Sequence, residues 1–258
     1  MIEASQPAPI RIQSFTSLEQ FEQCVALEEA VWGYDPADII PSRMFLLASR
    51  IGGQVMGAFV ADSPNAVGFA LAIPGVRNGH SYLHSHMVGV LSEYRNRGIA
   101  RALKLAQRED ALARGFELME WTFDPLEIKN AYINIAKLGA IVRRYKRNFY
   151  GASSSPLQGG LPTDRVYAEW WLRSKRVERA LQGEPQTFEI VERVDVPSEI
   201  YAWKASPPDR AIAREVQARN AQALESAFAR DLAVLGYQRN QRGDGQFLLG
   251  RWDEQHGY

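Results

Sequence analysis

The residues best suited to chemistry in this chain stand at a predicted turn between a strand and a helix, where the sequence reads Arg95-Asn96-Arg97-Gly98-Ile99-Ala100-Arg101. A glycine in such a turn permits a left-handed backbone and a close approach of a ligand. The first N–H groups of the following helix lack carbonyl partners and carry the positive end of the helix dipole. Because cations are unfavourable at a helix N-terminus, the three arginines indicate an anionic ligand, and a pyrophosphate suits this geometry.

Two histidines precede the turn, in the strand that we predict over residues 81–91. Alternate residues of a regular strand share a face, so His84, His86, Val88 and Val90 are expected on one side. A histidine with a pKa of about 6.5 is largely neutral at pH 7 and can accept a proton from an ammonium group. His84 and His86 are therefore candidate bases, with hydrogen-bonded structural histidines as the alternative. No third ligand stands near this His-x-His pair, so we expect no metal.

Further polar residues stand in later predicted elements. Asn130 and Asn134 are spaced i, i+4 on a predicted helix, where amides have poor propensity, so a role toward a ligand is one interpretation. Tyr132 lies between them, and packing in the core is the alternative to a chemical role. Arg143 and Arg165 stand on predicted strands and either face solvent or pair with a carboxylate of a substrate or acyl group.

The elements that must position these residues alternate between strands and helices. We expect strands over 10–15, 54–61, 66–73, 81–91, 116–123, 141–150 and 163–173, and helices over 18–32, 42–50, 99–114 and 125–138. Turns are expected over 74–79 and 151–162. Later residues suggest a strand over 187–194, a helix over 209–235 with an apolar stripe, and a strand over 246–252. This predicts a tail over 1–9, a mixed α/β domain over 10–175, and a C-terminal lobe over 176–258 that packs on it.

The composition indicates an ordinary globular protein of 258 residues, of which 46% are hydrophobic. Lys plus Arg equals Asp plus Glu at 30 each, so we expect no general attraction to nucleic acid or to a membrane. The single cysteine, Cys24, excludes an internal disulfide, fits a reducing compartment, and is expected to be a small buried apolar residue. Without a secretory signal or a long apolar run, the expected location is the cytoplasm.

The turn and its surroundings resemble the GNAT superfamily of N-acyltransferases. Arg95-x-x-Gly98-x-Ala100 is similar to the Gln/Arg-x-x-Gly-x-Gly/Ala loop that binds the pyrophosphate of acyl-CoA in that superfamily. A strand that ends at Val90 precedes the turn, and a strand, a helix that ends at Lys137-Leu138-Gly139 and another strand follow it in the superfamily's order. The resemblance implies a GNAT fold, with a mixed and mostly antiparallel sheet flanked by helices.

The resemblance also implies roles for particular residues. The strand before the loop would pair with the pantetheine arm, and a Glu base of one branch corresponds to His84. The tyrosine that often protonates the departing thiolate is replaced here by Ile135, and Tyr132, one turn earlier on the same face, is the candidate substitute. The implied contacts with acyl-CoA come from Val88, Gly89, Val90, Arg95, Asn96, Arg97, Gly98, Ile99, Ala100, Arg101, Asn130 and Asn134.

Several sequence segments look like those of a less studied bacterial branch, some members of which are associated with N-acylamino-acid racemases. These segments are 84–90, 122–126, 161–165 and the C-terminal extension. The resemblance implies direct transfer from acetyl-CoA or succinyl-CoA to the amine of a small molecule, such as an amino acid, without a covalent enzyme intermediate. Because the usual tyrosine is missing, a non-catalytic acyl-CoA-binding or regulatory module is the alternative. Whether the protein forms a homodimer is left open by the sequence. A dinucleotide-binding Rossmann enzyme is disfavoured, since no Gly-x-Gly-x-x-Gly follows a strand.

Overall fold

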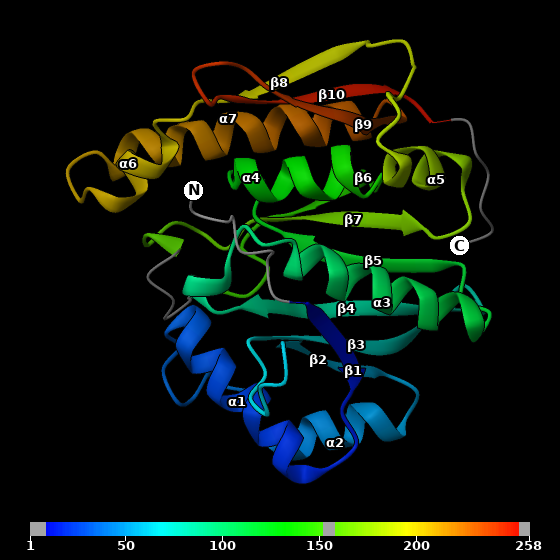
Figure 1. The fold of residues 1–258 in the computed structure, drawn as a ribbon. Helices are drawn as coiled ribbons and strands as arrows, with labels where there is room; N and C mark the ends of the chain where they lie inside the picture. The colour runs from blue at the N-terminus through cyan, green and yellow to red at the C-terminus, as the bar shows by residue number, and fades with distance from the viewer. Residues whose placement is uncertain (1–8, 152–157, 253–258) are drawn as a thin grey trace, which may run out of the picture. The chain divides into compact units, whose positions relative to one another are not determined.

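The computed structural model describes residues 9–151 and 158–252, which fold into two compact units (Figure 1). Unit 1 contains residues 1–76 and 81–116, and unit 2 contains residues 77–80 and 117–258. The expected tail lies outside the described residues except for Pro9, and half of the expected turn over 151–162 does so too. Within the described residues, no helix has the length and apolarity needed to cross a membrane.

Unit 1 is built on four neighbouring strands in the order β1-β2-β3-β4. β1 and β3 both pair antiparallel with β2, and Met56 of β2 lies opposite Ala70 of β3. β3 and β4 are joined by Asn78 and Gly79, which both have positive φ angles. The elements of this unit are β1 (Ile10–Ser14), α1 (Leu18–Trp32), α2 (Ser42–Arg50), β2 (Gln54–Val60), β3 (Gly68–Arg77), β4 (His80–Val90), η1 (Ser92–Tyr94) and α3 (Ile99–Ala113).

Local signals in the sequence explain the ends of the first helices. Ser17 and Gln20 form a capping box at the start of α1, in which each side chain accepts a hydrogen bond from the backbone of the other. Gly33 ends the helix in the left-handed conformation, with φ of 59°. α2 begins directly after Pro41. These boundaries confirm the helices expected over 18–32 and 42–50.

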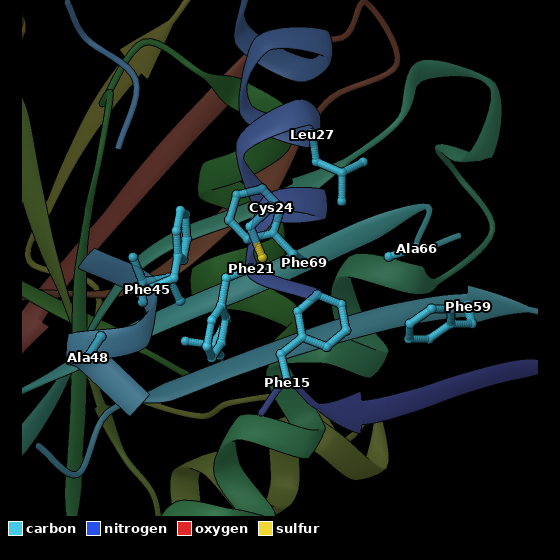
Figure 2. Packing of buried hydrophobic residues seen from close by; sticks show 11 residues of the cluster. Phe15, Phe21, Cys24, Leu27, Phe45, Ala48, Phe59, Ala66 and Phe69 are labelled. Carbon is cyan, nitrogen blue, oxygen red and sulfur yellow. The ribbon is translucent and has the colours of Figure 1, made fainter. Parts of the chain in front are cut away.

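The strands of unit 1 bury apolar residues on both faces. On one face, α1 and α2 pack on β2 and β3 through a cluster rich in phenylalanine, which Figure 2 shows around Cys24. Cys24 is a fully buried free thiol, as expected. On the other face, Ile99 and Leu103 of α3 pack on β2, β3 and β4. The residues of the first cluster are Phe15, Phe21, Cys24, Leu27, Phe45, Ala48, Val55, Phe59, Ala66, Phe69 and Leu71.

Unit 2 continues with strands in the order β5-β7-β6-β9-β10-β8, and the pairs along this order are antiparallel. Because β6 pairs with β9, residues after 175 extend the same sheet that holds β5 and β7. The elements are β5 (Leu118–Phe123), α4 (Ile128–Ala131), η2 (Tyr132–Lys137), β6 (Ile141–Lys146), β7 (Arg165–Trp171), α5 (Lys175–Gln182), β8 (Glu192–Val196), α6 (Ile200–Ala205), α7 (Arg210–Phe228), β9 (Leu232–Arg239) and β10 (Gly245–Arg251).

Two buried basic side chains strengthen unit 2. The Arg176 guanidinium donates to the backbone carbonyls of Gly139 and Leu235. Lys204 Nζ lies 3.1 Å from the carboxylate of Asp124 and 2.9 Å from that of Glu127, and these carboxylates raise the pKa of the lysine although its burial acts in the opposite direction. The expected fold class, a mixed α/β structure with a mostly antiparallel sheet flanked by helices, is confirmed.

Several expected boundaries are wrong. The long helix over 209–235 ends at Phe228, because Asp231 adopts a positive φ of 58° and the chain then enters β9 with Leu232 and Leu235. Ile212, expected on the apolar stripe, is exposed. The strand expected over 187–194 is β8, which starts later, and β6 stops at residue 146 instead of 150. The turn expected over 74–79 is confined to Asn78 and Gly79, and α5 and α6 were not predicted from the sequence.

A buried carboxyl group lies within unit 1. Glu28 of α1 is fully buried, its Oε1 accepts a 3.4 Å hydrogen bond from the backbone of Ile40, and its Oε2 has no partner among the described residues. This burial raises the pKa of Glu28 from an ordinary 4.5 to about 7. Cys24 lies one turn earlier, and burial together with the Glu28 charge raises the pKa of its thiol. The charged form of Glu28 therefore opposes folding.

We predict that Glu28→Gln makes the protein more stable at pH 8. Between pH 4.5 and 7 the folded chain holds a proton at Glu28 that the unfolded chain has released, so the free energy of unfolding falls as pH rises, by about 3 kcal/mol. Glutamine keeps the acceptor for Ile40 and removes the charge. Chemical denaturation from pH 5 to 8 checks this, with exposed Glu29→Gln as the control. Parallel curves for wild type and Glu28→Gln would contradict it.

Candidate functional site at the turn between β4 and α3

The turn from β4 into α3 opens a helix N-terminus to solvent. Gly98 stands at the N-cap with φ of 81° and has no side chain to cap the helix, and Asn96 also has a positive φ of 62°. Arg95, Arg97 and Ala100 are exposed, whereas Ile99 is buried and fixes the first turn of α3. The N–H groups of this first turn have no carbonyl partner within the helix and therefore point toward solvent or a ligand.

Side-chain contacts fix the shape of this turn. Arg95 Nε donates to the carbonyl of Val90 at 3.2 Å, which ties the turn to the end of β4. The Arg97 guanidinium lies over the ring of Tyr94, 5.1 Å from its centroid. No acidic residue occupies the first turn of α3. The dipole, the free N–H groups and the arginines thus all favour an anion here, as the sequence predicts.

The side chains of β4 change face once along the strand. Ser85 bonds to α3, and Val88 and Val90 pack in the α3 cluster, although two residues stand between Ser85 and Val88. Met87 instead packs in the cluster of α1 and α2. An added Cβ at Gly89 would lie 2.8 Å from the Trp32 ring of that same cluster. One residue more than regular alternation allows therefore stands between Ser85 and Val88, as in a β-bulge.

This change corrects the expected alignment of β4. His84 and His86 have ring centroids 6.1 Å apart, which fits residues i and i+2 on one face, opposite to the face of Ser85. The histidines therefore face the side of α1 and α2, whereas Val88 and Val90 face α3. The prediction that all four residues share a face was wrong, because the strand is not regular at His86 and Met87.

The two histidines differ in environment. Burial, followed by the neighbouring His84, lowers the pKa of His86 below its ordinary value of 6.5. His86 is consequently neutral at pH 7 and has a ring nitrogen that can accept a proton. His84 is half-buried beside it. Among the described residues, no three His, Cys, Asp or Glu side chains gather as metal ligands would.

A buried polar network fixes the middle of β4 to α3. Lys104 Nζ lies 2.7 Å from Ser85 Oγ, which donates to Gln107 Oε1 at 2.9 Å. Gln54 of β2 donates to the Gln107 carbonyl and to the Asp110 carboxylate. Burial lowers the pKa of Lys104 well below its usual value. This network holds the backbone on which both histidines stand. The sequence offered one signal for it, a lysine and a glutamine on the buried side of an amphipathic helix.

The asparagines and the tyrosine of the candidate site lie in unit 2. Asn134 is buried, and its Nδ2 donates to Asn130 Oδ1 at 3.1 Å. From Tyr132 to Lys137 the helix is of the π type, a form that often occurs at functional sites. Its wider turns put Ile135 in the core and leave Tyr132 half-exposed, so the expectation that these two share a face was wrong.

The ring of Tyr132 lies near two cations. Lys137 Nζ is 5.4 Å from the ring centroid, and the Arg239 guanidinium is 5.9 Å from it. Asp124, in the turn before α4, accepts a 2.8 Å hydrogen bond from the backbone of Leu126. The N-cap of α4 is Glu127, because the helix begins at Ile128, three residues later than the sequence predicts.

The two predicted substrate arginines have different partners. Arg143 pairs with the buried carboxylate of Glu169 at 2.5 Å, so its charge is used within the fold. Arg165 donates to the Asp164 carbonyl at 2.8 Å and to the amide oxygen of Gln158 at 3.5 Å. Both of these acceptors are neutral. The structure thus separates a charge-paired arginine from one whose charge is not neutralised by a described residue.

The described geometry matches the acyltransferase class that the sequence resembles. Residues 19–131 match the family model described as "Acetyltransferase (GNAT) family". This part of the chain is therefore similar to a GNAT acetyltransferase domain. The model extends over both histidines, the turn and α3. A search of the curated proteins finds no match for this sequence.

Solved structures show the same fold at low identity. A putative GNAT acetyltransferase from Desulfovibrio desulfuricans has a TM-score of 0.51 at 11% identity, covering 64% of this chain and 99% of its own. The ribosomal-protein-S18-alanine N-acetyltransferase from Escherichia coli has a TM-score of 0.51 at 14% identity, covering 70% and 100%. An N-acetyltransferase from Staphylococcus aureus Mu50 has a TM-score of 0.51 at 16% identity, covering 64% and 100%.

We predict that Gly98→Ala weakens coenzyme A binding at least tenfold and destabilises the protein by about 1 kcal/mol, because alanine resists a φ of 81°. Gly115→Ala is the matched control, since Gly115 has a φ of 82°, and a Cβ added at either glycine meets no atom within 4 Å. Both variants should lose similar stability in denaturation. Calorimetry should show weaker binding for Gly98→Ala alone, and equal affinities in the two variants would contradict a role for this turn.

Proposed function

We propose that the protein is an acyl-CoA-dependent N-acyltransferase that moves an acetyl or succinyl group directly to the amine of a small molecule, such as an amino acid. The observation that carries this proposal is the solvent-exposed N-terminus of α3 at Gly98, flanked by three arginines. Backbone N–H groups and cations of this kind fit a pyrophosphate. Acyl-CoA would supply an activated thioester, and the chain would supply binding, orientation and proton transfer.

The residues proposed to hold acyl-CoA fall into three groups. The backbone of Val88, Gly89 and Val90 would pair with the pantetheine arm, and residues 95–101 would hold the pyrophosphate. Asn130 and Asn134, which already bond to each other, would contribute amide groups toward the same ligand. No metal is needed for this chemistry, because the nucleophile is an amine and the leaving group is a thiol.

The proposed base is His86 or His84. An ammonium acceptor must lose a proton before its nitrogen can attack a carbonyl carbon, and a neutral imidazole can accept that proton. The lowered pKa of His86 keeps it in the neutral form at pH 7, which supports this role. Tyr132 is proposed to donate a proton to the departing sulfur, and the cations Lys137 and Arg239 lie near its ring.

A non-catalytic acyl-CoA-binding module is the second candidate, because the tyrosine usual in the family is replaced by the buried Ile135. An assay of thiol release distinguishes the enzyme from the non-catalytic module. The purified protein would be given acetyl-CoA or succinyl-CoA with pools of amino acids, other small amines and peptides that start with alanine. The peptides are included because one of the similar structures is named for acting on a ribosomal protein. Release that depends on an amine supports the enzyme, and binding of acyl-CoA without release across all pools supports the module.

We predict that replacing the catalytic base lowers kcat/KM by about 100-fold or more. His86→Gln and His84→Gln would be compared, with exposed His80→Gln as the control. If His86 is the base, kcat/KM of the wild type should fall as pH drops through a pKa below 6.5, because protonation removes the acceptor. Full activity in both variants would remove the base assignment, and an unchanged Kd for coenzyme A would show that binding is intact.

A further inference from the structure

One face of the sheet in unit 2 carries most of the basic side chains of its strands. Thr122 of β5 lies opposite Tyr167 of β7, and Glu120 opposite Glu169, so these residues share a face. Arg165 of β7 lies opposite Lys146 of β6 on this same face. We call it the arginine face, and it holds Arg77, Glu120, Thr122, Arg143, Arg144, Lys146, Arg165, Tyr167 and Glu169.

An irregularity in β6 adds positive charge to the arginine face. The register between β6 and β7 shifts between Val142 and Tyr145, so the intervening Arg143 and Arg144 both reach the carboxylate of Glu169. Arg144 also pairs with Glu120 at 2.6 Å, and Arg77 does so at 2.8 Å.

The carboxylates of the arginine face are therefore occupied. Glu120 and Glu169 are buried, and they are outnumbered by the cations Arg77, Arg143, Arg144, Lys146 and Arg165. A face with this excess of cations attracts anions. On this face, an arginine that lacks a carboxylate partner is the best candidate for binding an anion.

Arg165 meets that description. Its guanidinium lies over the ring of Tyr150, 5.2 Å from the centroid. Its two hydrogen bonds go to a backbone carbonyl and a glutamine amide, and no described residue forms an ion pair with it. A guanidinium has five N–H donors, so three are left for another acceptor.

The partner ring is itself held in place. The Tyr150 hydroxyl lies 3.0 Å from Thr122 Oγ1, and the Tyr150 backbone N–H donates to Thr163 Oγ1 at 2.9 Å. Phe149 packs edge-on against Tyr150, with ring centroids 4.6 Å apart. Both aromatic side chains are nevertheless exposed, Tyr150 at 46% and Phe149 at 36%. Large exposed aromatic groups beside an unneutralised cation form a surface suited to an organic anion.

We infer that Arg165, held over Tyr150, binds the carboxylate of the acyl acceptor, so that the acceptor class is amino acids with a free carboxylate. A planar guanidinium binds a carboxylate through two parallel N–H···O bonds, and the aromatic ring keeps the guanidinium oriented for them. This inference rests on the proposed N-acyltransferase function. Arg165 and Tyr150 would then recognise the carboxylate. Arg143 has a structural role, because it is paired with Glu169.

The test compares free amino acids with their amides, which keep the amine and lose the carboxylate. Alanine, phenylalanine and glutamate would each be paired with the corresponding α-amide as acceptors. The wild type should prefer the free acids in kcat/KM. Arg165→Gln should lower kcat/KM for the acids by about 10- to 100-fold and leave the amides unchanged, because only the acids lose a charge-assisted hydrogen bond. For the acids, kcat/KM of Arg165→Lys should fall between the values of the wild type and of Arg165→Gln.

Matched variants separate this site from general effects of charge. Arg193→Gln removes one exposed positive charge from β8 and should leave the acid preference unchanged. Tyr150→Phe keeps the ring and should retain most of the preference, whereas Tyr150→Leu removes the ring and should lower it. Equal losses on acids and amides in Arg165→Gln, or no acid preference in the wild type that still acylates amines, would overturn the inference and leave the proposed function intact.

A second readout does not depend on turnover. Calorimetry would measure binding of N-acetylalanine, N-acetylphenylalanine and N-acetylglutamate against their α-amides. We expect the acids to bind more tightly to the wild type and to Arg193→Gln, and to lose this advantage in Arg165→Gln. If no amine supports thiol release, the proposed function fails, and these titrations still decide whether the carboxylate site exists. Equal affinities for acids and amides, or no heat with any acid, would overturn it.

Discussion

The positive φ of Gly98 is the constraint on which the candidate site depends. It turns the chain from β4 into α3 without a side-chain cap, so the first N–H groups of α3 stay available to a ligand. A serine or aspartate at this position would cap the helix with its own oxygen and occupy those donors. Buried Ile99 anchors the helix immediately after the turn, while the neighbouring arginines remain exposed. Rigid packing and an uncapped, exposed helix N-terminus are thus combined within four residues.

The strand before this turn is held by polar contacts that most cores avoid. A lysine buried beside a serine is costly unless its amine loses its proton or is hydrogen-bonded, and the Lys104 amine shows a lowered pKa and a short contact with Ser85. Ser85 lies between the two histidines in the sequence and faces the opposite side of β4. The network therefore fixes the backbone from the side opposite to the histidines.

Much of the fold could be predicted from the sequence, because its signals are local. The capping box at Ser17, the stop at Gly33 and the start at Pro41 each depend on a few neighbouring residues. The turn at Gly98 is also local, since a glycine and a helix start define it. The spacing of apolar residues led to wrong predictions where tertiary structure determines the secondary structure. Leu232 and Leu235 continue the helical spacing of α7, yet Asp231 breaks the helix and they become part of β9.

Both errors at the candidate site have the same physical origin, a departure from regular backbone periodicity. The bulge in β4 puts His86 and Met87 toward one side, and the π-helix separates the faces of Tyr132 and Ile135. The irregular register of β6 similarly allows adjacent arginines to reach Glu169.

Such departures cannot be read from alternating or 3.6-residue patterns, because the inserted residue has no signature of its own type. They are maintained by the surrounding packing and occur often near functional sites. In this chain each one changes which side chains share a face. Roles assigned from regular spacing alone would therefore group His84 with Val88 and Tyr132 with Ile135, whereas the contacts of these residues separate them.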